Sequence, residues 1–191
     1  MGTSNHIPDF NGIAADILSR TPRMAATEAV KFFKECFVKQ GFTDRSFQGW
    51  PERTSPLGGK RLLYGTGALM QSVRERGVTA TGARVGSDAV YAGLHNDGGT
   101  IVVTEAMKKY WWARYYEFAG KVRRTGKGRL SQAKGNQAIS KKAAFCKAMA
   151  LRKTGSKVKV PARPFIGHSD ALMNNLEGWV IRQIELRCGG D

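Results

Sequence analysis

Tyr91–Ile101 has the sequence YAGLHNDGGTI. Its large apolar side chains are Tyr91, Leu94 and Ile101. They flank a polar run that ends in Gly98 and Gly99, and glycine reaches positive φ without steric cost. We therefore interpret this stretch as a tight corner between packed elements, anchored by its large side chains.

A second stretch, Val160–Gly167, has the sequence VPARPFIG. Pro161 and Pro164 fix their own φ and push the residue before each of them into extended geometry. The segment is therefore predicted to be a stiff, non-helical strap that ends where a new helix begins.

Three motifs occur in a fixed order along the chain. They are Leu-x-x-Thr-Gly-x-Leu at 63–69, Tyr-Ala-x-x-His-x-x-Gly-Gly at 91–99 and Pro-Ala-Arg-Pro-Phe-Ile-Gly at 161–167. Their order resembles the phage virion morphogenesis proteins of Mu-like phages and prophages, over about residues 13–186. The resemblance implies a non-enzymatic structural protein of the virion, of the tail completion or head-tail joining type.

The resemblance also implies roles for the matching residues. These are Thr66, Gly67, Tyr91, Ala92, His95, Gly98, Gly99, Pro161, Ala162, Arg163, Pro164, Phe165 and Gly167. Most are expected to shape the fold: the glycines through φ, the prolines through rigidity, and Tyr91 and Phe165 through packing. Arg163 is expected to hold a carboxylate or backbone carbonyls, because its fork suits several acceptors.

The composition suits one soluble domain spanning residues 1–191. No apolar run approaches the roughly 20 residues of a membrane span, so no membrane partner is expected. Met1–Pro8 lacks the charged and apolar regions of a signal peptide, which predicts synthesis in a cytosol.

Charge is concentrated in one third of the chain. Residues 106–169 contain 17 Lys or Arg and a single acid, Glu117, whereas the remainder has 14 basic and 14 acidic residues. The whole net charge of +16 therefore lies in this block. Such a block indicates an anionic partner or an exposed surface that repels itself.

The expected elements give an α+β domain, with a small antiparallel sheet packed against N- and C-terminal helices. We expect a helical turn that stops near Thr21, a helix from Thr21-Pro22 to Gly41, a surface loop over Thr43–Lys60, a hairpin turning at Thr81-Gly82, a strand over Thr100–Val103, helices over Glu105–Ala119 and Ala138–Lys153, a strand over Lys157–Val160, and a helix capped by Ser169 or Asp170 and finished by Gly189-Gly190. Phe47 and Trp50 either hold the surface loop to the core, which is the favoured interpretation, or contact a partner.

Residues 105–155 are predicted to form an inserted helical hairpin with a mobile basic loop over 120–137. Candidate contacts with DNA or a protein partner are Lys121, Arg123, Arg124, Lys127, Arg129 and Lys134. The first helix of the hairpin carries a dense aromatic cluster that includes Trp111, Trp112, Tyr115 and Tyr116. These rings either lie between the sheet and the next helix or form a subunit interface, with equal weight.

Nothing in the sequence has the spacing of a catalytic, metal or cofactor site. His95 beside Asp97 is the one tempting pair, and an i, i+2 pair in a glycine-rich turn is more often a local hydrogen-bonding arrangement. Cys36, Cys146 and Cys188 are too widely separated for a zinc cluster or a disulfide framework. We expect no enzyme, no metal and no cofactor.

The expected function is therefore assembly of a virion at the tail end or the head-tail junction, as an oligomeric ring. Expected partners are other head or tail proteins, further copies of the chain and, non-specifically, packaged DNA, first in the bacterial cytoplasm and then in the virion. The alternative is a basic protein that binds nucleic acid without sequence preference, because a basic loop beside aromatic residues offers phosphate contacts and stacking surfaces.

Overall fold

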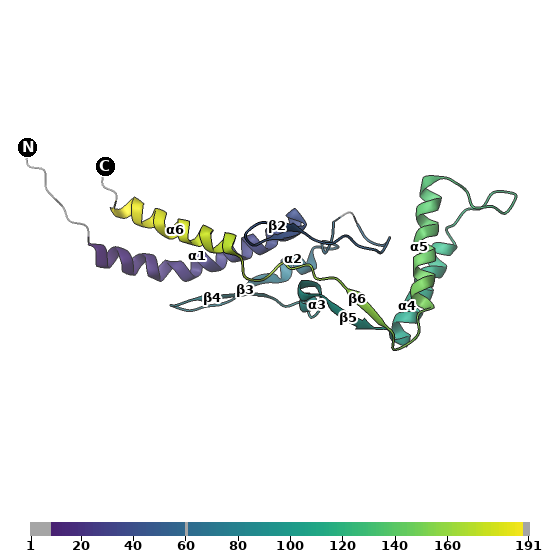
Figure 1. The fold of residues 1–191 in the computed structure, drawn as a ribbon, viewed down its shortest axis with the longest axis horizontal. Coiled ribbons are helices and arrows are strands. Elements are labelled where there is room, and N and C mark those ends of the chain that lie inside the picture. The colour runs from purple at the N-terminus through teal and green to yellow at the C-terminus, as the bar shows by residue number, and fades with distance from the viewer. Residues whose placement is uncertain (1–8, 60, 189–191) are drawn as a thin grey trace, which may run out of the picture. The chain divides into compact units, whose positions relative to one another are not determined.

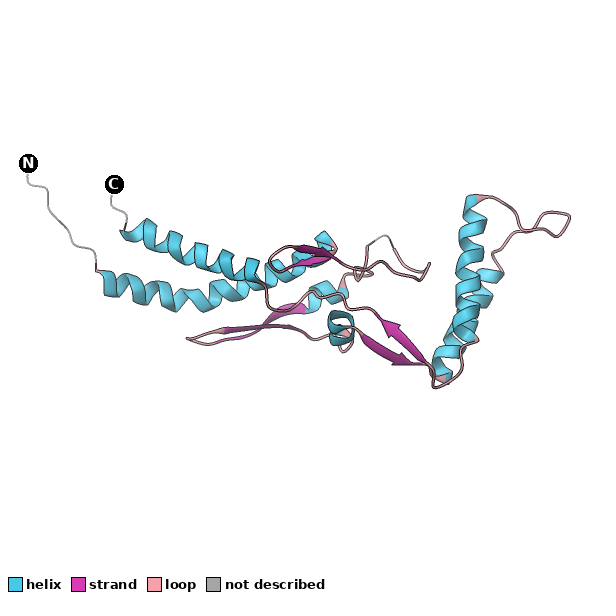
Figure 2. Cartoon of the chain, in the orientation of Figure 1, coloured by secondary structure: helices cyan, strands magenta, loops and turns pink. Residues whose placement is uncertain are grey.

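The computed structural model describes residues 9–59 and 61–188 and confirms the α+β class. It contains helices and three separate antiparallel pairs of strands (Figures 1 and 2). Met1–Pro8, Lys60 at the end of the expected loop, and the expected stop at Gly189-Gly190 lie outside the described residues. The chain divides into two compact units, each with its own contacts.

Unit 1 combines the chain up to Trp50 with Thr66–Ala92 and the chain from Arg163 onward. Its elements are α1 (Phe10–Lys39), β1 (Gly41–Thr43), β2 (Phe47–Gly49), α2 (Ala68–Ser72), β3 (Val73–Val78), β4 (Ala83–Ser87) and α6 (Asp170–Cys188). Unit 2 combines Pro51–Gly65 with Gly93–Ala162. Its elements are β5 (Gly99–Val102), α4 (Glu105–Ala119), α5 (Lys134–Ala150) and β6 (Lys157–Val160), and α3 (Ala92–Asp97) begins at the last residue of a unit 1 segment.

The first helix is continuous, so the predicted break at Thr21 is wrong. The helix α1 is capped by Asp9, whose Oδ1 accepts from Gly12 N at 3.0 Å, and it holds Pro22 in its interior. Thr21 does not cap a new helix; its hydroxyl donates to Ile17 O at 2.8 Å. Proline removes one hydrogen bond from a helix, but Ile17 before it and Ala26 after it are both buried. Burial on both sides keeps the helix continuous.

The core of unit 1 joins α1 to distant parts of the chain, and α1 and α6 lie side by side (Figure 1). Phe37 of α1 and Phe165 are both fully buried. Trp50 is also buried, its ring centroid lies 5.5 Å from that of Phe37, and its Nε1 donates to Pro164 O at 2.7 Å. The predicted anchoring role of Trp50 is therefore confirmed. Phe47 is 53% exposed and does not share this role.

The expected surface loop begins with a small hairpin that was not predicted. Strands β1 and β2 pair antiparallel, with Gly41 opposite Gly49. A Cβ on Gly41 would lie 2.4 Å from Gln48 O, so only glycine allows this close pairing. Strands of three residues are too short to show an alternating pattern.

The predicted hairpin at Thr81-Gly82 is confirmed. Strands β3 and β4 pair antiparallel, and Thr79 N donates to Gly82 O at 2.8 Å. The register shifts between Glu75 and Gly77, which marks a bulge in β3.

In unit 2, β5 and β6 pair antiparallel, and α4 packs against α5. Helix α4 has the predicted bounds, and Thr104 Oγ1 accepts from Met107 N at 3.2 Å as its N-cap. Helix α5 begins at Lys134, four residues before the predicted start at Ala138. The buried apolar side chains of this unit include Val103, Ala143, Cys146 and Ala150.

Candidate functional site

The two stretches that were predicted to organise the fold meet at Gly98 in unit 2. Gly98 has a φ of +73°, and a Cβ there would lie 2.7 Å from Ala162 N and 3.0 Å from Val160 O. The neighbouring Gly99 pairs with Val160 across β5 and β6. Position 98 therefore requires glycine for two reasons: its φ is positive, and the strap approaches it too closely for a side chain.

The first motif also contains a glycine with positive φ. Gly67 has a φ of +82° and is buried directly before α2, where its carbonyl accepts from Gln71 N at 2.9 Å. Thr66 Oγ1 accepts from Ala68 N at 3.4 Å. These residues turn the chain into α2, a helix that was not predicted, and Gly67 acts through its φ, as expected of the motif glycines.

The motif residues with large side chains divide into buried and exposed groups. Phe165 is fully buried, which confirms its predicted packing role, and Arg163 is 7% exposed. A guanidinium at that burial requires acceptors, which suits the role predicted for Arg163. Tyr91, for which a packing role was also predicted, is 47% exposed and is not part of the buried core. It precedes α3, where the chain leaves unit 1 and its core.

The candidate pair of His95 and Asp97 lies at the end of α3. His95 is half-buried, and the Asp97 carboxylate accepts from Asn96 Nδ2 at 2.7 Å. This contact joins Asn96 to Asp97, and the local hydrogen-bonding arrangement expected between His95 and Asp97 stays a prediction.

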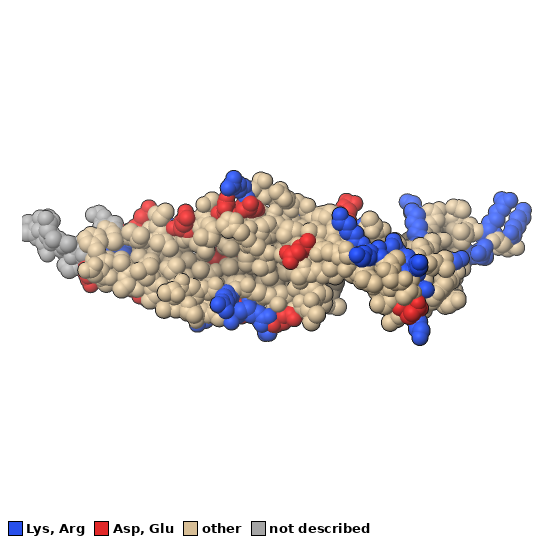
Figure 3. Space-filling view, turned by 60° about the horizontal axis from the view of Figure 1, so that its bottom comes forward, with Lys and Arg blue, Asp and Glu red and all other residues tan. Residues whose placement is uncertain are grey.

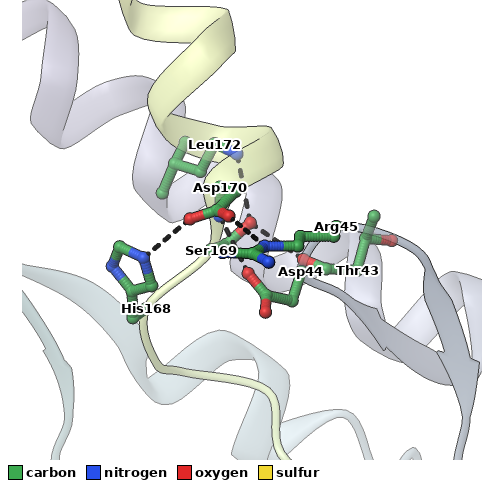
Figure 4. A network of polar contacts seen from close by, with 7 residues as sticks. All are labelled: Thr43, Asp44, Arg45, His168, Ser169, Asp170 and Leu172. Carbon is green, nitrogen blue, oxygen red and sulfur yellow. Dashed lines mark hydrogen bonds and ion pairs between the residues drawn. The ribbon is translucent and has the colours of Figure 1, made fainter.

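The start of α6 carries a dense polar network in unit 1 (Figure 4). Ser169 is 2% exposed; its Oγ accepts from Leu172 N at 3.1 Å and donates to Thr43 O at 2.8 Å. Asp170 N donates to Asp44 Oδ1 at 2.9 Å. Ser169 is thus the N-cap, one of the two residues predicted for that position, and the cap ties α6 to the end of β1.

Asp44, His168 and Asp170 present ligand atoms within 4.8 Å of one another. Both oxygens of Asp170 already have partners: Arg45 Nε donates to Oδ2 at 2.7 Å, and His168 Nε2 lies 2.9 Å from Oδ1. Arg45 and His168 hold the pKa of Asp170 below its usual range. A guanidinium inside the cluster opposes a second cation, so the geometry indicates a helix cap and not a metal site.

The net charge is distributed unevenly between the two units. Unit 1 has 12 Lys or Arg and 11 Asp or Glu in the sequence, whereas unit 2 has 19 basic and four acidic residues. Unit 2 therefore carries +15 of the net +16. Basic side chains gather over α4, α5 and the connection between them (Figure 3).

The connection between α4 and α5, predicted to be a mobile loop, contains a hairpin-like turn closed by a single β-bridge. Arg124 and Leu130 form an antiparallel bridge, and Thr125 N donates to Arg129 O at 2.7 Å. Gly128 N donates to Thr125 O at 2.8 Å, and Gly128 has a φ of +75°. We call residues 123–131 the basic turn.

Asn136 in the first turn of α5 holds the base of the basic turn and was missed by sequence reasoning. Its Oδ1 accepts from Arg123 N at 2.7 Å, and its Nδ2 donates to Arg123 O at 3.0 Å and to Ser131 O at 2.8 Å. The amide is 7% exposed and uses both donors and its acceptor. An asparagine within a Lys-Gly-Asn-Gln run gives no sequence signal that separates it from a loop residue.

The six candidate cations all lie on or beside this turn, and all six are exposed: Lys121, Arg123, Arg124, Lys127, Arg129 and Lys134. Lys121 Nζ donates to Glu117 Oε1 at 2.9 Å, which holds the pKa of Glu117 below its usual range. Arg124 Nη1 donates to Gly128 O at 3.0 Å and braces the turn. Arg123, Lys127 and Arg129 are the exposed cations of the turn left to meet a ligand.

The candidate interface aromatics separate into two faces of α4. Trp111 packs edge-on against Phe145 of α5 with ring centroids 5.8 Å apart. Trp112 stacks on Tyr116 at 5.9 Å, and Tyr116 is 66% exposed. Tyr115 contacts Tyr116 and lies under Lys147 Nζ. No residue of α4, which the structure describes in full, is buried, so one face of this helix is uncovered.

An apolar groove of about 320 Å³ lies between α1 and α6 in unit 1. Its lining includes Phe10, Ile13, Ile17, Leu18, Val180 and Ile184. Phe10, Leu18 and Ile184 are 57%, 67% and 45% exposed, so apolar surface of both helices remains accessible. Surface of this kind marks sites of association.

Comparisons with family models, curated protein sequences and solved structures return no significant match to this chain. The resemblance to virion morphogenesis proteins therefore depends on the three ordered motifs. Among the described residues, no helix has the length and apolar character needed to cross a membrane.

Proposed function

We propose that the chain is a structural protein of phage virion morphogenesis that completes the tail end or joins the tail to the head. The observation that carries the proposal is the contact of Gly98 with Val160 and Ala162, in which two of the three motifs fix one backbone crossing. The motif residues determine the backbone conformation and the packing of the chain. Such a use of motif residues suits a protein that functions as a rigid part of an assembly.

The proposed form is an oligomeric ring. The uncovered apolar groove between α1 and α6 supports self-association, because a second copy that covers it removes apolar surface from water. The charge of unit 2 opposes a symmetric contact between two copies of that unit. Contacts between copies are therefore assigned to unit 1, which is nearly neutral.

The test is electron microscopy of lysates from the carrying phage or prophage, with the gene disrupted and then restored by complementation. Heads separated from tails, or tails of uncontrolled length, are expected on disruption and are reversed by the restored gene. Normal joined virions in the disrupted lysate would exclude the proposed role.

A second candidate function is nucleic-acid binding outside a virion, which the net charge of +15 on unit 2 favours. The dependence on salt concentration distinguishes the two candidate functions. Binding through many phosphate contacts weakens steeply between about 50 and 200 mM salt. An oligomer held by an apolar groove persists over the same range.

A further inference from the structure

We propose that the basic turn is a preorganised surface for the phosphate backbone of double-stranded DNA, with Asn136 as the residue that positions it. The inference names a partner for the proposed function and rests on that function only for its biological setting. It is tested on purified protein, so its failure is distinguishable from failure of the virion role.

The first step of the argument is that the cations are presented by an ordered scaffold. The carbonyl of Arg123 accepts from both Asn136 Nδ2 and Ser131 N, and the Arg123 amide donates to Asn136 Oδ1. Both sides of the turn are thereby fixed to the start of α5. A surface whose backbone is already ordered loses less conformational entropy on binding than a mobile loop does.

The second step is that no nearby acidic residue of the chain neutralises the cations of the basic turn. The acid nearest in sequence, Glu117, already pairs with Arg114 and Lys121. Arg123, Lys127 and Arg129 keep exposed side chains, and Lys134 at the start of α5 adds a further exposed cation. A second copy of this turn would repel it, so the partner has to be anionic.

The third step selects duplex DNA over a single strand. Residues 123–131 contain no aromatic side chain on which an unpaired base could stack. The exposed ring nearest to the turn in sequence, Tyr116, already stacks on Trp112. A two-stranded ribbon fits the major groove of a duplex, which is about 12 Å wide, and from there its cations reach phosphates on both strands.

The test measures binding of the full chain to a fluorescent duplex of random sequence, by anisotropy, over a series of salt concentrations. The wild type is expected to bind, with affinity that falls linearly on a double-logarithmic plot against salt. The triple variant Arg123→Ser, Lys127→Ser, Arg129→Ser is expected to bind about tenfold more weakly and to reduce the slope by about 2 to 3.

The matched control is Arg152→Ser, Lys153→Ser, Lys157→Ser, which removes three exposed cations of the same unit outside the turn. It is expected to retain most of the affinity. Asn136→Ala changes no charge and is expected to weaken binding at every salt concentration with the slope unchanged, because only the order of the turn is lost. If that variant fails to fold, the triple variant still decides, since its changes are at exposed positions.

Three results would overturn the inference. They are absence of binding by the wild type at about 50 mM salt, equal loss in the triple variant and its control, and tighter binding of a single strand of the same sequence than of the duplex. Equal loss in the two variants is expected if only the total charge matters. Tighter binding of the single strand is expected if base stacking dominates.

Discussion

Phe37 and Phe165 lie with their ring centroids 4.9 Å apart and with no exposed surface, although one belongs to α1 and the other to the strap before α6. The part of the strap from Arg163 onward therefore belongs to the core of unit 1. The hydrogen bond from Trp50 to Pro164 O fixes the same segment from a third part of the chain.

Phe165→Ala is expected to reduce the free energy of unfolding by about 3–5 kcal/mol, because it removes a fully buried ring and leaves a cavity. Phe47→Ala, at a ring that is 53% exposed, should change it by only about 0.5 kcal/mol. Urea unfolding measures both. Equal losses in the two variants would contradict the assignment of the strap to the core.

Gly98→Ala is expected to cost about 1–3 kcal/mol of stability, because the new Cβ meets Ala162 N and the φ of +73° is strained for alanine. Gly93→Ala is the control in the same stretch. It lies within α3, where a Cβ meets nothing within 4 Å, so a gain of up to about 1 kcal/mol is expected. Thermal unfolding of the pair would show the opposite signs, and a neutral Gly98 variant would refute the close crossing.

Asp170→Asn is expected to destabilise the chain near pH 7 and to matter less in acid. Arg45 and His168 lower the pKa of the folded carboxyl below its unfolded value of about 3.9. The contribution is therefore present above that value and is lost as pH falls below it. The urea midpoints of the variant and the wild type should keep their difference down to about pH 4 and converge as pH falls from about 4 towards 2. A gap that stays constant over this range would exclude the ionised carboxylate as the cause.

The Cys36 thiol is expected to lower the free energy of unfolding as pH becomes alkaline. Burial raises its pKa from 9.0 to about 11, so the thiol of the unfolded chain ionises first as pH rises. The contribution is complete below pH 9 and is lost as pH approaches 11. Cys36→Ala, expected to be about 1 kcal/mol less stable at pH 7, should close that gap by pH 10. A gap of unchanged size would show that the thiol has the same pKa in the folded and the unfolded state.

Ile184→Lys is expected to lower the oligomeric mass measured by light scattering, because it places a charge in the apolar groove between α1 and α6. Leu151→Lys adds the same charge at an exposed apolar position of unit 2 and should leave the mass unchanged. A wild type that is monomeric at micromolar concentration, or equal effects of the two variants, would remove the groove from the ring interface.

Strong local signals were sufficient to predict much of the secondary structure. Thr104 followed by Glu105 marks the start of α4, and the alternation over Lys157–Val160 marks β6. Pro22 misled the prediction because burial on both sides of it outweighs the lost hydrogen bond. The rule that proline interrupts a helix considers only the local backbone and does not include the packing of side chains against the rest of the fold.

The site was predictable in its residue types but not in its geometry. Charge counting located the cations of the α4–α5 connection, whereas their order depends on the hydrogen bonds of Asn136, which no spacing rule contains. Tyr91 was expected to act through packing because of its size and its motif, and its 47% exposure depends on where the chain leaves unit 1. Contacts of this kind are set by tertiary structure.

The insertion of α4 and α5 begins and ends at neighbouring atoms: Val103 N donates to Ser156 O at 2.8 Å, and Gly155 N donates to Val103 O at 2.9 Å. A short turn could therefore replace residues 104–155 without separating β5 from β6. Those residues hold 14 Lys or Arg and two Glu, so the exchange would reduce the net charge from +16 to +4. The hairpin is thus joined to the strands at one place, and its removal would leave the pairing of β5 with β6 in place.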